Sequence, residues 1–160
     1  MLFRSDEKES RGVLWVQDEV QSGVIVLPYK NGKVSVEITR ADVETNLWVQ
    51  DDKLHAKVKV DMAGKIVENT VPWLDFDQEE LSRIEAMAVE TIQDEVYGAM
   101  DKAKSLKADV FGFGNWLHKS DTESWKALKD HWKEAFTGME IEVEGECDIP
   151  TSGLSTKPSS

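Results

Sequence analysis

A long amphipathic helix is the feature that most restricts the folds open to this sequence. Asp77 is placed to cap its first turn, and Glu80 follows three residues later, as in a capping box. Phe76 and Leu81 have the spacing of a hydrophobic staple across that turn. The stripe then recurs at helical spacing through Ile84, Ala88, Ile92, Val96, Met100 and Ala103. Such a helix, about 45 Å long up to a break near 106–109, is long enough to cross a whole sheet.

Strand patterns flank this helix on both sides. Before it, strands are predicted over 13–17, 22–29, 34–39, 42–50 and 53–62, the last continuing over 66–71 past a bulge at 63–64. Asn31-Gly32 predicts a tight turn. After the helix, residues 139–149 alternate apolar and acidic side chains. The order predicts an α+β domain: an antiparallel sheet of about four to six strands, with the long helix and two shorter helices on one face.

Charge predicts one strand pairing. Glu140, Glu142, Glu144, Glu146 and Asp148 share one face of the last strand, where they would repel one another without counter-charges. A basic outward face is offered by 53–62, through His55, Lys57 and Lys59. We therefore expect these two strands to be neighbours, because opposite charges across strands stabilise a sheet.

An aromatic and glycine-rich segment follows the long helix. It contains Ala108, Asp109, Phe111, Gly112, Phe113, Gly114 and Trp116, and Trp125 and Trp132 follow it. Because glycine costs a helix about 1 kcal/mol relative to alanine, the two glycines indicate close contact with a ring or backbone. Such contact would join the helices to the strands. The Trp125/Trp132 stripe has two interpretations, a core position or a groove for another protein.

Two aspartates are predicted to begin helices in this region. Asp109 has two interpretations, a cap for a helix running to His118 or a buried carboxylate that accepts hydrogen bonds from an indole N–H or from a partner protein's backbone. Ser120 or Asp121 is expected to cap the last helix, with Glu123 as its capping-box partner, and Gly138 to end it.

The segment 108–119, the spaced Trp125 and Trp132, and Phe136 resemble the C-terminal domain of the Ger(x)C family. Glu9-Ser10-Arg11-Gly12-Val13-Leu14-Trp15 resembles the start of that domain, and Thr151-Ser152-Gly153-Leu154 resembles its end. Members are C subunits of bacterial spore nutrient germinant receptors. The resemblance implies one domain over 12–150, after a flexible segment 1–11 and before a disordered tail 151–160.

The resemblance also implies a function. Family members are non-catalytic lipoproteins that act with membrane A and B subunits at the spore inner membrane, on its outer face. Membrane association would come only through a lipid anchor on a cysteine that this chain lacks, so we interpret the chain as a soluble, excised C-terminal domain. Other domains of the same C subunit are further expected partners.

Composition and spacing exclude several other functions. With 31 acidic and 19 basic residues the chain carries a net charge of −12, which argues against nucleic acid as a partner. His118 and His131 lack metal-site spacing, and the strand carboxylates are spread along the strand instead of surrounding a point. Cys147, the single cysteine, has no matched base. We therefore expect no catalytic residue, metal or cofactor.

Two functional hypotheses remain. In the first, the domain is a protein–protein docking module whose acidic strand face, Glu140, Glu142, Glu144 and Glu146, contacts the partner. In the second, the domain binds a small-molecule germinant in a groove between helices and sheet, which would require a pocket with polar groups among Trp48, Trp73 and Trp116.

Overall fold

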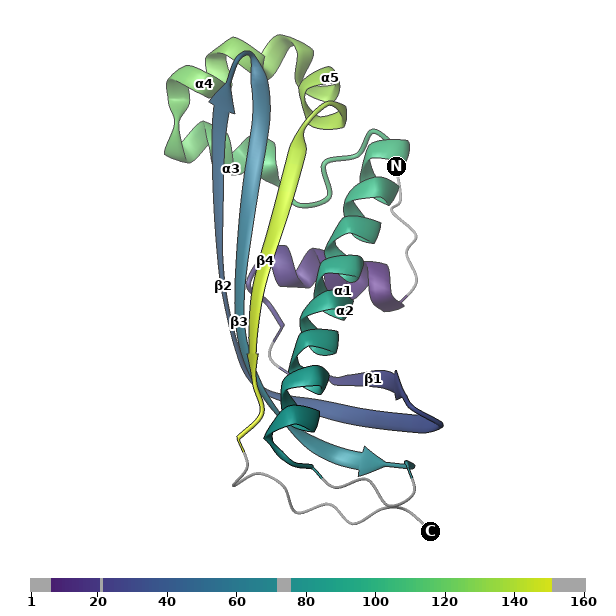
Figure 1. Ribbon diagram of the computed structural model, residues 1–160. Coiled ribbons are helices and arrows are strands. Elements are labelled where there is room, and N and C mark those ends of the chain that lie inside the picture. Colours follow the sequence, from purple (N-terminus) through teal and green to yellow (C-terminus); the bar gives the residue numbers. More distant parts are fainter. Residues whose placement is uncertain (1–6, 21, 72–75, 151–160) are drawn as a thin grey trace.

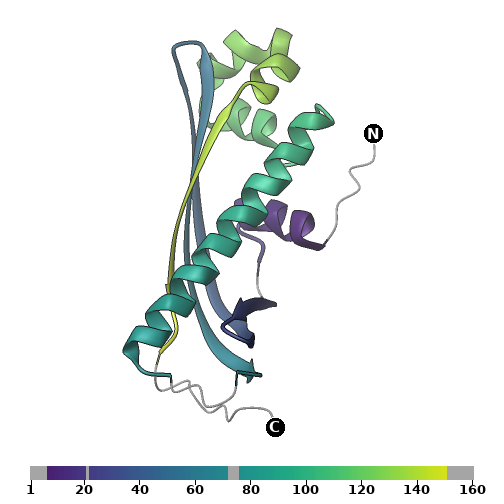
Figure 2. The same ribbon diagram turned by 45° about the vertical axis from the view of Figure 1, so that its right-hand side comes forward.

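The protein, seen in a computed structural model that describes residues 7–20, 22–71 and 76–150, is an α+β domain (Figure 1). Its one sheet has the strand order β1-β2-β3-β4. The strands are β1 (Val24–Tyr29), β2 (Gly32–Gln50), β3 (Lys53–Asn69) and β4 (Glu140–Asp148). The helices are α1 (Glu7–Val16), α2 (Gln78–Ser105), α3 (Phe113–Ser120), α4 (Thr122–Leu128) and α5 (Trp132–Thr137). Figure 2 shows the helices on one side of the sheet and the other side open.

The predicted pairing of the last strand with 53–62 is confirmed, but its direction differs from the fully antiparallel sheet that we expected. β1, β2 and β3 pair antiparallel, whereas β4 pairs parallel to β3, with His55 opposite Glu140 and Lys59 opposite Glu144. The reason is the length of α2, whose 28 residues extend about 42 Å. A helix of that length returns the chain to the end where β3 began, as a parallel pair requires.

The strands of the two β-hairpins are longer than the sequence suggested. β2 is continuous over the stretches predicted as two strands, with register shifts between Ser35 and Val36 and between Ile38 and Arg40. The extra residue of the second shift is in β2, opposite the Ala63–Gly64 position where we expected the bulge. In the first hairpin the turn residues are Lys30–Asn31, one position earlier than predicted, and Lys30 takes a positive φ of 51°.

Two predictions about the N-terminal region are wrong. Residues 13–17, predicted as a strand, lie mostly in α1, and residues 7–11 of the segment predicted to be flexible are helical too. The reason is tertiary packing: a Cβ added to Gly12 would lie 2.1 Å from the Glu95 carbonyl oxygen, so the backbones of α1 and α2 are in direct contact. This contact places the fully buried Trp15 in the core. Residues 1–6 and the predicted tail 151–160 lie outside the described residues.

A buried ion pair reinforces the α1–α2 contact. The Arg11 Nε lies 2.6 and 2.9 Å from the two carboxylate oxygens of Glu95, and its Nη1 donates to the Val24 carbonyl at 3.1 Å. Glu95 is only 4% exposed. Because a buried carboxylate without its partner is strongly destabilising, this pair links the position of α1 to that of α2 and β1.

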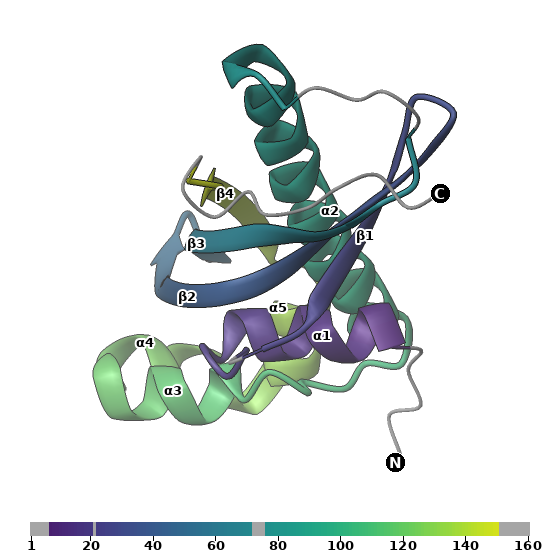
Figure 3. The same cartoon turned by 90° about the horizontal axis from the view of Figure 1, so that it is seen from below.

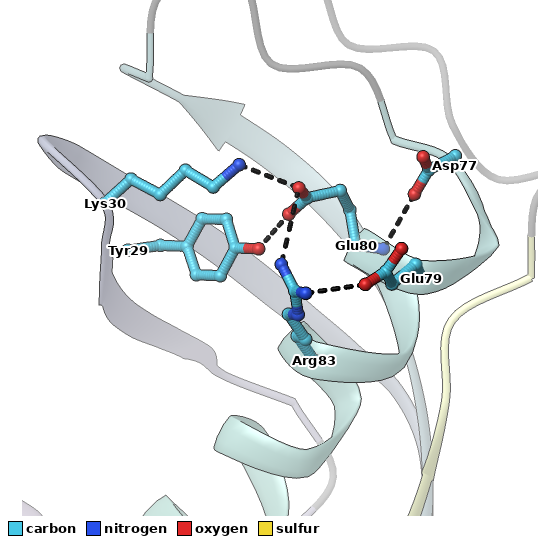
Figure 4. A network of polar contacts seen from close by, with 6 residues as sticks. All are labelled: Tyr29, Lys30, Asp77, Glu79, Glu80 and Arg83. Carbon is cyan, nitrogen blue, oxygen red and sulfur yellow. Dashed lines mark hydrogen bonds and ion pairs between the residues drawn. The ribbon is translucent and has the colours of Figure 1, made fainter.

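The start of α2 is held by a polar network (Figure 4). Asp77 caps the helix as predicted, accepting a hydrogen bond from the Glu80 amide at 2.8 Å. The Glu80 carboxylate, however, binds the Tyr29 hydroxyl, Lys30 Nζ at 2.7 Å and Arg83 at 3.8 Å. The second half of the capping box is therefore absent, since a nearby cation and phenol attract this carboxylate toward the β1–β2 hairpin.

The last predicted helix is broken into two. Asp121 caps α4, its Oδ1 accepting from the Ser124 amide at 3.2 Å and its Oδ2 from the Ser124 hydroxyl at 2.6 Å. These bonds lower the Asp121 pKa from its ordinary value, the hydroxyl bond having the larger effect. A short 3-10 turn, Lys129–His131, separates α4 from α5, and Gly138 follows α5 as expected.

Two glycine substitutions test the α1–α2 contact. We expect Gly12→Ala to lower the free energy of unfolding by about 1–3 kcal/mol, because the new methyl group would meet backbone that cannot move aside. Gly98→Ala is the matched control within α2, where nothing lies within 4 Å of the new Cβ, and it should raise stability by about 0.5–1 kcal/mol. Urea unfolding measures both. Equal effects of the two substitutions would contradict the contact.

Candidate protein interface on the open sheet face

The open sheet face is the surface of β2, β3 and β4 turned away from the helices (Figure 2). Alternation assigns its residues, because the intervening Leu54, Val58 and Met62 are buried in the core. The outward side chains in question are Asp42, Glu44 and Trp48 of β2, His55, Lys57, Lys59 and Asp61 of β3, and Glu140, Glu142, Glu144 and Glu146 of β4. The four glutamates that the sequence proposed as an interface therefore lie together along one strand.

Part of this acidic row is neutralised by β3. Lys53 Nζ lies 2.8 Å from Glu140 Oε1, and His55 Nδ1 lies 3.6 Å from Glu140 Oε2. Lys57 Nζ lies 3.0 Å from Glu144. The hydrogen bond from Lys53 lowers the Glu140 pKa, and the hydrogen bond to Glu144 raises the Lys57 pKa. These cross-strand ion pairs accord with the β3–β4 register and use two of the four glutamates.

The other two glutamates are available to a partner. Among the described residues, no cation comes within ion-pair distance of Glu142 or Glu146. Lys59 faces Glu144 across the strands and likewise has no ion pair within the described part of the chain. The open sheet face thus combines satisfied cross-strand pairs with unpaired charges, the majority of them negative.

A hollow of about 720 Å³ lies at the centre of this face. Its charged lining is six carboxylates against the single amine of Lys59: Asp18, Asp42, Glu44, Asp61, Glu144 and Glu146. Arg40 at its margin binds Asp42 at 2.7 Å and Asp61 at 3.2 Å, and these carboxylates raise the Arg40 pKa. The hollow is suited to a basic group of a partner, since carboxylates of one sign concentrate the field there.

An aromatic pair lies near the hairpin end of the face. The Trp48 and His55 rings, opposite one another on β2 and β3, stack with centroids 5.4 Å apart and planes 9° apart. Both line a second hollow of about 390 Å³, together with Tyr97 and Lys104 of α2. Sequence reasoning named Trp48 only as a pocket candidate. A two-residue turn at Asp51–Asp52 sets the β2–β3 register and pairs Trp48 with His55. Recognising that turn in the sequence could have placed His55 beside Trp48.

Of the remaining pocket candidates, Trp116 does not line the hollow beside Trp48. Trp116 is half-buried and packs against Phe113, with ring centroids 6.4 Å apart. Trp73 lies outside the described residues. Hence Trp48 and Trp116, the two candidates within the described ranges, do not share a pocket.

The aromatic–glycine segment forms the helical layer near the β2–β3 hairpin (Figure 1). Ala108 and Asp109 precede α3, and the Asp109 carboxylate accepts hydrogen bonds from the amides of Phe113 at 3.0 Å and Gly114 at 2.8 Å. This is the capping role of the two that we considered. Phe111 and Phe113 are buried and stack at 5.0 Å.

The two glycines of this segment have different roles. A Cβ on Gly114 would lie 3.1 Å from Trp132 and 3.2 Å from Trp125, so close contact is found there. The indoles meet each other edge-on at 5.3 Å and are partly buried against the core. At Gly112 the prediction of close contact is wrong, since nothing lies within 4 Å; its positive φ of 77° is what favours glycine.

The other candidate groups show no catalytic arrangement. His118 and His131 are exposed, and within the described ranges no group of histidine, cysteine and acidic residues could hold a metal ion. Burial, with Glu85 and Asp148 nearby, raises the pKa of the Cys147 thiol to about 12, which makes it a poor nucleophile. In the same ranges, no helix is both long and apolar enough to cross a membrane.

The sequence matches a spore germination family, and the fold matches a solved structure. The family described as "Spore germination B3/ GerAC like, C-terminal" matches residues 1–153. This chain belongs to that family. A relative of this GerAC-like domain, the spore germination protein YndF of Bacillus subtilis (strain 168), is 23% identical over 144 residues. The crystal structure of the GerBC protein has the same fold, with a TM-score of 0.81 at 20% identity over 91% of the GerAC-like domain.

These relatives are longer than the GerAC-like domain. The match spans 88% of this chain but 36% of YndF, and 46% of the GerBC chain. The domain therefore corresponds to a part of each relative, in agreement with the C-terminal assignment of the family.

Gly112 offers a test of backbone conformation in the GerAC-like domain. Gly112→Ala should lower the free energy of unfolding by about 1–2 kcal/mol, because a side chain disfavours the left-handed region. Gly112→Asn should cost less, since asparagine tolerates that region better. Thermal unfolding measures both, and an Ala variant as stable as the parent would show that φ is not the constraint.

The ion pairs between β3 and β4 predict that stability depends on pH. The folded-state pKa of Glu140 is lowered, so its contribution to stability is present above the unfolded value and is lost as the pH falls through the folded value. We expect Lys53→Gln to move the Glu140 midpoint upward in an NMR titration of the side-chain carboxyl carbon. Lys119→Gln, on the exposed end of α3, is the matched control and should leave the midpoint in place. An unchanged Glu140 midpoint in Lys53→Gln would contradict the Lys53–Glu140 ion pair.

Proposed function

We propose that this domain is a non-catalytic docking module of a spore germinant receptor C subunit, acting in nutrient-triggered germination. Its open sheet face would bind a basic surface of the membrane A or B subunit, or of another domain of the same C subunit. The observation that carries the proposal is that Glu142 and Glu146, which make no ion pair within the described ranges, lie beside a hollow with six carboxylates and one amine. Family membership supplies the setting.

The arrangement favours docking over chemistry. Five of the six carboxylates are spread over three strands of an exposed sheet face, and Asp18 follows α1, so the contacts that they offer are electrostatic. Complementary charge of this kind gives specificity and association rate more than affinity. In the full-length protein a lipid anchor would hold this face near its partners at the spore inner membrane.

Charge reversal tests the proposed face. The double variant Glu142→Lys/Glu146→Lys should weaken association with the outer-face parts of the A or B subunit by about tenfold or more, equal to about 1.4 kcal/mol. The matched control is Glu90→Lys/Asp94→Lys, an equal charge change on exposed positions of α2. Biolayer interferometry measures both. Equal losses would indicate a net-charge effect only, and unchanged affinity in the first variant would leave the acidic face without a role.

A second candidate function rests on the hollow beside Trp48. Its volume of about 390 Å³ and its mixed lining, with Tyr97 and Lys104, fit a small nutrient molecule. Titration with amino acids and sugars, followed by tryptophan fluorescence, should show a saturable change that is absent in Trp48→Phe. A flat response in the parent protein would remove this candidate.

A further inference from the structure

Most of the sheet margin is closed by side chains. Along the outer margin of β4, four residues of α2 bond its backbone or the residues that flank it. Lys104 Nζ donates to the Met139 carbonyl at 2.6 Å, and Gln93 Nε2 donates to the Val143 carbonyl at 2.9 Å. In the other direction, the Val143 amide donates to the Tyr97 hydroxyl at 3.1 Å, and the Ile149 amide donates to the Glu85 carboxylate at 2.8 Å. Proteins cover exposed strand edges because free backbone groups pair with other chains.

The margin formed by β1 is closed in another way. The Val24 carbonyl already accepts a hydrogen bond from Arg11, and Pro28 has no N–H to donate. The strand is also short, at six residues. An added strand would find few free groups there.

The free margin of β2 differs from both. Its lower half is covered, since Ile38 N donates to Gly23 O at 2.9 Å and Val43 N donates to Asp18 at 3.1 Å. From Val43 onward the register with β3 is regular, so Thr45, Leu47 and Val49 direct their N–H and C=O groups to the free margin. Within the described chain, the backbone of Leu47 and Val49 has no partner on that side.

The sequence along this free margin suits strand pairing. The segment Thr45–Gln50 has no charge and no proline, and three of its six residues, Thr45, Trp48 and Val49, are of strand-forming types. Trp48 is 37% exposed. In Figures 1 and 3, α3 and α4 extend sideways past β2, so a strand added here would contact the helical layer as well as the edge.

Charge indicates what kind of strand would pair. Glu44, Asp51 and Asp52 lie along or at the end of this margin, and Asp18 marks its other end. A second copy of the chain is disfavoured, because each carries a net charge of −12 and antiparallel pairing about Leu47 would bring Asp52 opposite Asp42. A strand with basic side chains outward and apolar ones toward the helices would complement both surfaces.

We infer that β2 receives an antiparallel strand of a partner protein along Thr45–Gln50, with alternating basic and apolar residues. The inference rests on the proposed docking function and names how a partner is held. Backbone hydrogen bonds to Leu47 and Val49 would provide affinity, while Glu44 and Trp48 would select a basic side chain, through an ion pair and a cation–π contact.

Amide exchange of the whole chain with a peptide probe tests this inference. The probe is a peptide of about seven residues, a usual strand length, alternating valine and lysine with blocked ends. When the protein is saturated with the peptide, the amide hydrogens of Leu47 and Val49 should exchange with solvent at least about tenfold more slowly. Those of Asn46 and Trp48, which already face β3, should not change.

Two methylated peptides control for simple charge attraction. In antiparallel pairing the valines lie opposite Leu47 and Val49, so N-methylation of the valines should abolish protection. N-methylation of the lysines keeps the charge and should preserve protection. Equal binding of the two peptides, or unprotected Leu47 and Val49 amides at millimolar peptide, would overturn the inference.

The remaining outcomes separate this inference from the proposed function. If the Leu47 and Val49 amides become protected as the concentration of this protein alone is raised, a second copy of the chain pairs with β2. That result would overturn the inference that a partner protein supplies the strand. If a receptor subunit binds and Glu142→Lys/Glu146→Lys weakens that binding, yet the Leu47 and Val49 amides stay unprotected, the docking function is supported and strand addition to β2 is contradicted. If the peptide protects these amides but no receptor subunit binds, strand addition is supported and docking to the receptor is contradicted.

Discussion

The return of the chain along α2 is the constraint on which the rest of the structure depends. Because α2 runs from the end of the sheet where β3 finishes toward the end where β3 began, and α3, α4 and α5 complete the return, β4 begins at the same end as β3 and pairs parallel to it. That direction places Glu140 and Glu144 opposite His55 and Lys59, and brings Lys53 and Lys57 within ion-pair distance of the two glutamates. An antiparallel β4 would reverse the order of its glutamates against β3. The charge pattern of the open sheet face therefore depends on the direction of β4.

Close backbone contact keeps α2 in that position. Gly12 lets α1 touch the backbone of α2, and the Arg11–Glu95 pair extends the contact to β1. At the other side of the sheet, α2 side chains bond the margin of β4. One helix thus contacts both margins of the sheet, and its polar residues satisfy backbone groups that would otherwise be free.

The two surfaces proposed for binding share a physical basis. The sheet has helices on one side only, so the opposite face of β2, β3 and β4 and the free margin of β2 remain accessible (Figures 2 and 3). The face offers charge, through Glu142 and Glu146, whereas the margin offers backbone hydrogen bonds, at Leu47 and Val49. A basic extended segment of a partner could use both, since Glu44 belongs to the face and also borders the margin.

Local pattern and charge in the sequence determined much of this protein. They predicted α2 with its Asp77 cap, the alternation of β3 and β4, the pairing of these strands, and the α+β class, because each depends on spacing within one segment or on opposite charge between two. Only the tertiary structure decided that β4 is parallel, that 7–16 is helical and that Gly112 and Gly114 have different roles. It also decided that Glu142 and Glu146 make no ion pair in the part of the chain that the structure describes. These features depend on where distant segments meet: α2 against α1, the Trp125 and Trp132 rings against Gly114, and the two ladder lysines against only two of four glutamates.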